Sequence, residues 1–397
     1  MFLDEVSPLS RPRFTFLLLS SILLTFFIAS SAPTPLYRSY QELWGFNPVT
    51  LTVIFSVYTL GMLGALLVFG SISDYLGRKP VLMMAILIEV LAMVVFLCAS
   101  QVEHLLIARF AQGCATGIAT AVLGAYMLDV DMNKAAIANT IVPLIGMGLG
   151  VISSSLILDF GPMPMKLVYG IVTIFLLVQL LVLNILDEPV TRRRGALNIL
   201  RPSLRVPAGA RSMFFAILPM NTAVWALNGF FLSLVPSLVR LATPSKYATV
   251  GGVIVALMSF SGAIAVHLLK NRMPDKNIRF GGILLAGGVL GILWGVYSGV
   301  TTAFFVATML AGFGAGASFI SFTKSLLPLA APGQRASLIS SYYVVSQLSL
   351  IVPSVSLGIL VQYVGLTTAS YYFGAAVLVS LAVSALLMYT SRKAHSE

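Results

Sequence analysis

At residues 70–80 the chain reads Gly70-Ser-Ile-Ser-Asp74-Tyr75-Leu-Gly77-Arg78-Lys79-Pro80, a short charged stretch between two long apolar runs. Glycine at position 77 permits a left-handed turn, and Pro80 suits the first turn of the helix that follows. Asp74 fits beside a helix N-terminus, where partial positive charge favours a carboxylate. Arg78 requires an acidic partner, and Asp129 is the available one. The alternative reading is a short loop whose basic residues only fix its orientation.

Outward from this stretch, apolar runs continue along the whole chain of 397 residues. Hydrophobic residues make up 58% and charged residues 9%, with a mean hydropathy of +0.97, against roughly 25% charged in soluble domains. Each run reaches the about 20 residues that span a bilayer, and without alternation it can satisfy its backbone only as a helix. The sequence therefore predicts an all-α membrane protein with twelve transmembrane helices. The expected spans are 14–34, 49–69, 80–100, 104–128, 136–158, 165–186, 212–238, 247–269, 279–298, 300–323, 336–361 and 367–389.

The distribution of the 24 Lys and Arg predicts the orientation. With both termini in the cytoplasm, nineteen of them fall on the cytoplasmic side, four fall outside and Arg109 lies within the fourth span. Such a bias is the positive-inside rule, and it explains the net charge of +11 without a nucleic-acid partner. We expect a multi-pass protein of the inner or plasma membrane. Alternatively, the first run is a secretory signal cleaved near Ala32, which would leave eleven spans.

The longest polar interval, 187–211, divides the spans into six and six. The predicted organisation is an N-terminal segment (1–13), a six-helix bundle (14–186), a cytoplasmic linker (187–211), a second bundle (212–389) and a cytoplasmic tail (390–397). Two such pseudo-symmetric bundles predict a site where they face each other. The basic linker either touches anionic lipid headgroups or only enforces orientation.

Cysteine and histidine usage argues against metal and enzyme chemistry. The two cysteines sit in apolar runs, and the three histidines are scattered. A metal site or a catalytic centre needs such residues clustered. We therefore expect no cofactor, no metal and no enzymatic activity.

The stretch at 70–80 resembles the signature loop of the major facilitator superfamily of secondary transporters. Gly70, Asp74, Gly77, Arg78 and Lys79 match the signature, while Tyr75 replaces its first arginine. The resemblance implies that Asp74 with the N-terminus of helix 11, and Arg78 with Asp129, latch the two bundles in the outward-open state. Tyr75 removes one charge from that latch.

A second motif, Arg109-Phe-Ala-Gln112-Gly113, resembles the Arg-x-x-Gln-Gly pattern of the superfamily's proton-coupled drug exporters. The resemblance associates Arg109 with proton transfer, whereas a structural role would pair it with carbonyls at a helix end. The exporters' Gly-rich fifth helix is matched less well. Gly146 and Gly150 remain as a candidate hinge, but Val151 stands where proline would and Ser153–Ser155 replace a glycine pair.

Glu89 is a carboxylate deep within a span, roughly 13 Å into a core about 30 Å thick. A charge there costs about 2.5–3.5 kcal/mol, so its presence needs a reason. It is either a proton carrier or a neutral group hydrogen-bonded to a neighbouring helix. The same depth calculation separates Glu89 from Arg109 by about 8–10 Å along the membrane normal.

The helices that line the superfamily's central cavity offer aromatic and amide side chains here and few formal charges. The candidates for the substrate cavity are Tyr58, Gln112, Asn221, Trp225, Asn228, Phe231, Phe319, Tyr343 and Gln347. Such a lining suits a neutral or weakly cationic amphiphile. We therefore expect a monomeric alternating-access transporter that exports small hydrophobic or amphiphilic compounds in exchange for protons. The alternative is uptake or facilitated passage of a metabolite.

Overall fold

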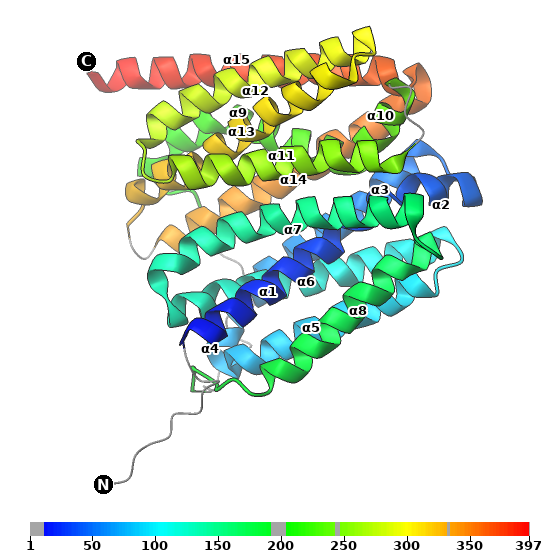
Figure 1. Ribbon diagram of the computed structural model, residues 1–397. Coiled ribbons are helices and arrows are strands. Elements are labelled where there is room, and N and C mark those ends of the chain that lie inside the picture. Colours follow the sequence, from blue (N-terminus) through cyan, green and yellow to red (C-terminus); the bar gives the residue numbers. More distant parts are fainter. Residues whose placement is uncertain (1–11, 192–203, 243–246, 332–333, 397) are drawn as a thin grey trace. The chain divides into compact units, whose positions relative to one another are not determined.

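The computed structural model describes residues 12–191, 204–242, 247–331 and 334–396, and helices make up all the regular structure in these ranges (Figure 1). Twelve of the helices are long and apolar enough to cross a membrane. The long helices are α1 (Pro12–Ser31), α3 (Pro48–Phe69), α5 (Arg78–Leu97), α6 (Val102–Val130), α7 (Met132–Phe160), α8 (Pro164–Leu183), α9 (Ala208–Ser233), α11 (Ala248–Leu269), α12 (Pro274–Ser298), α13 (Thr301–Leu326), α14 (Arg335–Val364) and α15 (Leu366–Ser396).

The predicted fold class is confirmed, because each expected apolar run corresponds to one long helix. Helical structure satisfies every backbone group inside the segment, which a lipid-embedded chain requires. Most helix ends lie within a few residues of the predicted ones. The last helix is the exception, since α15 continues through the predicted tail to Ser396.

Short helices between the spans were not predicted. They are α2 (Tyr37–Trp44), α4 (Ser73–Leu76), α10 (Val235–Ala242) and the 3-10 turn η2 (Leu327–Leu329). Helix α2 buries Tyr37 and Tyr40 and is followed by Gly45, whose φ of 67° is the left-handed conformation that glycine favours. Pieces this short have no long apolar run, so hydropathy alone does not reveal them.

The chain forms two compact units. Of the described residues, the first contains 12–30, 57–146 and 162–191, and here α5 packs against α6 and α8. The second contains 31–56, 147–161 and the described residues from 204 onward, with α13 packed on α12 and α11, and α9 packed on α14 and α15. The segments 31–56 and 147–161 precede the linker in sequence but belong to the second unit.

Within the first unit, glycines let α3 and α6 approach closely. A Cβ at Gly113 would press into the carbonyl of Tyr58 and lie 3.0 Å from the backbone nitrogen of Met62. A Cβ at Gly117 would lie 2.6 Å from the Met62 carbonyl oxygen. Small residues at such crossings are typical of membrane helices, where packing rather than hydrophobicity drives association. This crossing fixes α6 beside the residues described next.

Candidate functional site

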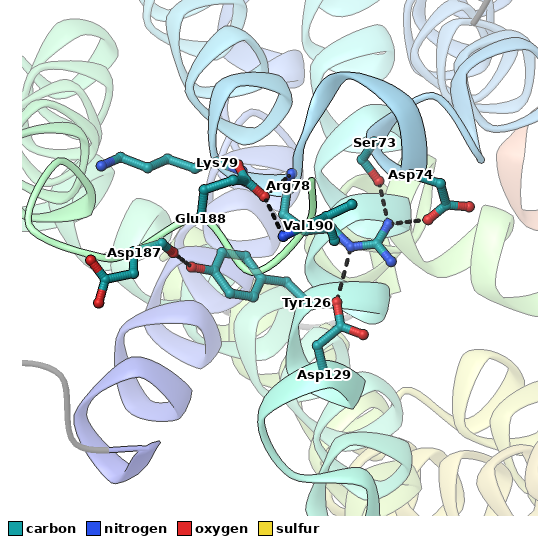
Figure 2. A network of polar contacts seen from close by, with 9 residues as sticks. All are labelled: Ser73, Asp74, Arg78, Lys79, Tyr126, Asp129, Asp187, Glu188 and Val190. Atoms are coloured by element: carbon teal, nitrogen blue, oxygen red, sulfur yellow. Dashed lines mark hydrogen bonds and ion pairs between the residues drawn. The ribbon is translucent and has the colours of Figure 1, made fainter. Parts of the chain in front are cut away.

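The loop between α3 and α5 is organised around Arg78 (Figure 2). Its Nη1 donates to Asp74 Oδ1 at 2.5 Å and to Ser73 Oγ at 2.7 Å, and its Nε donates to Asp129 Oδ2 at 3.1 Å. The predicted pair of Arg78 and Asp129 is therefore present. Ser73 and Asp74 are brought within reach by the single turn of α4. The result is one guanidinium held between two carboxylates from α4 and α6.

Glu188 completes this loop and was not predicted. Its Oε1 accepts from the backbone nitrogen of Arg78 at 2.8 Å, and its Oε2 accepts from that of Lys79 at 2.9 Å (Figure 2). Because α5 begins at Arg78, these are donors that its own helix leaves unsatisfied. Lys79 in turn donates its ammonium to the carbonyls of Asn184 and Leu186. The start of the predicted linker is thus tied to the signature loop.

Gly77 makes this capping possible. Its φ of 99° is accessible to glycine, and a Cβ there would lie 2.7 Å from Glu188 Oε2. Gly70, which follows α3, and Pro80, in the first turn of α5, frame the same loop. Asp74 pairs with Arg78 here, and its predicted contact with helix 11 stays a prediction.

A second polar cluster lies inside the first unit, within the spans. Glu89 on α5 is fully buried, and its Oε1 accepts from Gln112 Nε2 of α6 at 3.1 Å. Gln112 Oε1 accepts from Arg109 Nη1 at 2.5 Å. Gln112 thereby links Glu89 to Arg109, which the sequence predicts to lie at different depths in the membrane. Among the described residues, no donor lies within hydrogen-bonding distance of the other Glu89 oxygen, Oε2.

The same cluster holds the end of α1. Gln112 Nε2 donates to the carbonyl of Ala29 at 3.0 Å, and Arg109 Nη1 donates to that of Ser30 at 2.8 Å. The residue four positions after Ala29 is Pro33, which has no N–H to complete the helical bond. Gln112 therefore replaces the backbone donor that Pro33 cannot supply to Ala29, and Arg109 donates to the next carbonyl, that of Ser30. This arrangement is the helix-end pairing considered above as the structural role of Arg109.

Tyr58 of α3 covers the charged end of Arg109. The guanidinium carbon lies 4.3 Å from the centre of the Tyr58 ring, a cation–π contact. Both Tyr58 and Gln112 were predicted to line a substrate cavity. In the structure Gln112 is fully buried, with both its oxygen and its nitrogen engaged by Glu89, Arg109 and Ala29.

The other cavity candidates lie in the second unit, on α9, α13 and α14. Trp225 of α9 meets Phe319 of α13 edge-on, with ring centres 6.0 Å apart. Asn221 of α9 is buried and exchanges hydrogen bonds with Ser346 of α14. The remaining candidates differ in exposure: Phe231 and Gln347 are buried, Asn228 donates to its own helix, and Tyr343 is 37% exposed.

Helix α7 runs unbroken through Gly146 and Gly150 and contains Pro143. A Cβ at Gly146 would lie 2.8 Å from the Leu24 carbonyl oxygen, so this glycine serves a close approach to α1. Ser154, one of the three serines at 153–155, donates to the carbonyl of Ala32 at 2.6 Å. This hydrogen bond joins α7 to the residues after α1. The hinge role stays a prediction.

Metal ligands do not gather in the part of the chain that the structure describes. Within those ranges, no three His, Cys, Asp or Glu side chains are placed to hold an ion.

Comparisons with known proteins agree on one family. The Major Facilitator Superfamily sequence model matches residues 15–352. Multidrug resistance protein MdtL of Shewanella oneidensis is 29% identical over 76% of this chain and 78% of its own length. MdtL of Citrobacter koseri is 27% identical over 87% and 88%.

Solved structures show the same fold. The nucleoside transporter NupG superposes with a TM-score of 0.76 at 12% identity, covering 94% of this chain and 99% of that one. The human organic anion transporter MFSD10 superposes with a TM-score of 0.65 at 15% identity, with the same coverage. At these identities the likeness concerns the fold alone. Twelve spans, the signature loop and the family match together establish that this chain is a multi-pass membrane transporter of the Major Facilitator Superfamily and not an enzyme.

Proposed function

We propose that this transporter exports small hydrophobic or amphiphilic compounds in exchange for protons. The observation that carries the proposal is the buried Glu89–Gln112–Arg109 cluster, whose carboxylate has one hydrogen-bonded oxygen and one that has no donor among the residues the structure describes. The free Oε2 offers a place where a proton binds without displacing an existing hydrogen bond. The distant MdtL relatives, named as multidrug resistance proteins, support the export of drugs.

The cluster also suggests how a proton could act on the transporter. A charged carboxylate is a stronger acceptor than a neutral carboxyl oxygen, so protonation of Glu89 weakens its hold on the Gln112 amide. The same amide nitrogen donates to Ala29 at the end of α1. Proton binding to Glu89 therefore shifts the Gln112 amide from the Glu89 carboxylate toward the Ala29 carbonyl. Ala29 belongs to α1, and the corresponding helix lines the cavity in the family. Arg109 keeps the Gln112 oxygen in place during this exchange.

The substrate class follows from the side chains available in the second unit. Trp225 and Phe319 provide an aromatic edge, and Asn221 with Ser346 provides a neutral polar pair. An anion or a compact polyvalent cation would require a fixed counter-charge, whereas a single delocalised positive charge can lie against aromatic faces. We propose a neutral or weakly cationic amphiphile, carried by a monomer whose termini lie in the cytoplasm.

Reconstituted vesicles with an imposed proton gradient test the proposal. In inverted vesicles, the wild type is expected to accumulate ethidium when the interior is acidic. Glu89→Gln keeps the size and hydrogen-bonding capacity of the side chain but cannot carry a proton, so it should lose gradient-driven accumulation and keep ethidium binding. Glu103→Gln, which neutralises an exposed carboxylate near the start of α6, is the matched control and should transport like the wild type.

Two results would contradict the proposal. If Glu89→Gln accumulates ethidium as fast as the wild type, Glu89 is not the proton carrier. If the wild type equilibrates substrates equally well with and without a gradient, the alternative of facilitated passage of a metabolite replaces proton-coupled export.

A further inference from the structure

Two arginines line one hollow in the second unit. The hollow has an empty volume of about 410 Å³ and is formed by α2, α10, the end of α7 and the start of α11. Arg38 comes from α2 and Arg240 from α10, and the lining residues that the structure describes include no carboxylate. The rest of this lining is mainly apolar and includes Pro35, Leu158 and Val239. The hollow therefore combines positive charge with an apolar wall.

Membrane topology does not explain these two charges. Four of the 24 Lys and Arg are expected on the outer side, and two of these four line the hollow. The positive-inside rule disfavours basic residues in short outer connections. Helices α2 and α10 occupy corresponding positions, since each has eight residues and follows the first long helix of its predicted bundle. A shared binding function explains why both short helices bring an arginine to one place.

The protein itself leaves part of this charge unmatched. Arg38 Nε donates to Glu42 Oε1 at 2.8 Å, in an exposed contact within α2. In the part of the chain that the structure describes, no acceptor is bonded to the terminal nitrogens of Arg38, and no carboxylate pairs with Arg240. Arg240 is also exposed. An anionic ligand in the hollow would meet donors that are still available.

The carboxylate that follows the lining residue Leu158 is engaged elsewhere. Asp159 Oδ1 accepts from the backbone nitrogen of Ala248 at 3.0 Å. Its Oδ2 accepts from the backbone nitrogen of Thr249 at 2.7 Å and from the Thr249 hydroxyl at 2.6 Å. Helix α11 begins at Ala248, so both N–H groups are first-turn donors without a partner in their own helix. Asp159 therefore caps α11 and does not serve as the counter-charge for the arginines.

Packed helices close the hollow on its inner side. Helix α10 packs on α11. Next to the lining residue Gly251, a Cβ at Gly252 of α11 would lie 2.7 Å from the Cβ of Ser155 on α7. Farther along, a Cβ at Gly148 of α7 would collide with the ring of Phe260 on α11. A ligand therefore enters from the open side and cannot pass between α7 and α11.

Exposed apolar and aromatic side chains stand at the open side. Tyr247 lines the hollow, is 59% exposed and stacks on Phe160 with ring centres 5.8 Å apart. Leu241, which follows Arg240, is 61% exposed. Arginine beside aromatic and apolar side chains is typical of a bilayer surface, where headgroups and hydrocarbon meet. A free phosphate ion would use only the arginines, whereas a lipid would use both kinds of side chain.

We propose that this hollow binds the phosphate group of an anionic phospholipid. A guanidinium donates to two phosphate oxygens at once, so two of them recognise a phosphate more specifically than point charges would. The acyl chains then lie against the exposed apolar side chains outside the hollow. The site lies wholly within the second unit. Lipid binding there is independent of the direction and the coupling of transport.

Protection of a cysteine in the hollow tests the proposal. Ser39 is a half-buried lining residue, and Ser39→Cys replaces one oxygen with sulfur. In a background of Cys98→Ser and Cys114→Ser, this parent protein in dodecyl maltoside reacts with methyl methanethiosulfonate, which is neutral and therefore insensitive to nearby charge. Dioleoylphosphatidylglycerol at about ten times its Kd should slow labelling about tenfold, because about one hollow in ten is then empty.

Charge variants locate the effect, each compared with itself with and without lipid. Arg240→Gln removes a charged donor and should weaken binding about tenfold, so the same lipid concentration slows labelling only about twofold. Arg38→Gln should lose at least as much protection, because it also leaves Glu42 unpaired beside the hollow. Lys166→Gln is the matched control. It neutralises an exposed basic residue of α8 that is also expected outside but does not line the hollow, and it should be protected like the parent.

A series of added compounds separates the possible ligands. Dioleoylphosphatidylcholine has the same chains but carries its own positive charge, so it should slow labelling by less than about twofold. Inorganic phosphate alone should leave the rate unchanged. The proposal is overturned if either compound protects as well as dioleoylphosphatidylglycerol, because the hollow would then select a free anion or acyl chains alone. It is also overturned if Arg240→Gln and Arg38→Gln are both protected as strongly as the parent. Equal melting temperatures without lipid show that lost protection is not lost folding.

Discussion

Replacing Gly77 with alanine tests whether Glu188 can cap α5 only because position 77 has no side chain. At φ 99° and ψ 149°, position 77 has a conformation that is nearly restricted to glycine, so alanine costs about 1–3 kcal/mol in strain. The new Cβ would lie 2.7 Å from Glu188 Oε2 and 3.3 Å from Pro80 Cδ, so the carboxylate must move. Losing its cap on α5 adds about 0.5–2 kcal/mol. We expect Gly77→Ala to destabilise the protein by about 2–5 kcal/mol.

Thermal unfolding of purified protein in detergent measures this effect. Glu188→Ala alone removes the cap, and the double variant removes the cap and adds the strain. Because both single changes displace the same carboxylate, the double variant should be more stable than the sum of the two effects predicts, by about 1 kcal/mol. Gly45→Ala is the control for strain, since Gly45 has φ 67° and open space around it. It should cost only about 1–2 kcal/mol.

Strict additivity in the double variant would refute this reasoning. It would mean that the methyl group and the carboxylate do not compete for the same space. A Gly77→Ala variant that melts at the temperature of Gly45→Ala would refute it as well, because backbone strain would then account for the whole loss.

Two further predictions concern the loop and the helix crossing. Arg78→Gln should lower the rate of ethidium transport more than the affinity for ethidium, because the Arg78 ion pairs are proposed to act on the conformational equilibrium rather than on the substrate. Ethidium binding and transport are measured on one preparation. Equal losses of affinity and transport rate would contradict the prediction. Gly113→Ala should lower the melting temperature, by about 1–3 kcal/mol in stability, because the new Cβ would lie 2.9 Å from the carbonyl carbon of Tyr58. Gly64→Ala is the control and should leave the melting temperature unchanged, because nothing lies within 4 Å of the new Cβ. If Gly113→Ala and Gly64→Ala melt at the same temperature, α3 and α6 can move apart at little cost and the prediction is wrong.

The spans were predictable because lipid imposes length and composition on each helix separately. No information about distant residues is needed to recognise an apolar run of about 20 residues. The loop at 70–80 was also local, since its turn, its helix start and the need of Arg78 for an acid are all set within a few positions. The short helices lacked such a signal.

The polar clusters were predictable only in part, because they join residues far apart in sequence. The positions of Glu89 and Arg109 along their spans predict that the two residues lie at different depths in the membrane. They do not reveal that the Gln112 side chain connects the two. Glu188 and Asp159 each cap a helix about 90 to 110 positions away. A sequence reveals that a carboxylate is present near a helix end, but the partner helix is chosen by packing. Pro33 was a usable signal, since a missing N–H implies a carbonyl that needs another donor.

Gly148 of α7 and Gly252 of α11 leave space for side chains of the opposite helix, and this packing limits how the two helices can move. Ser155 sits against Gly252, and the Phe260 ring sits against Gly148, so each bulky group occupies a position where the other helix has no side chain. Sliding by one turn, about 5.4 Å, would drive Ser155 against the methyl group of Ala248 or Ala256 instead. Shear along the helix axes is therefore blocked by steric interlocking.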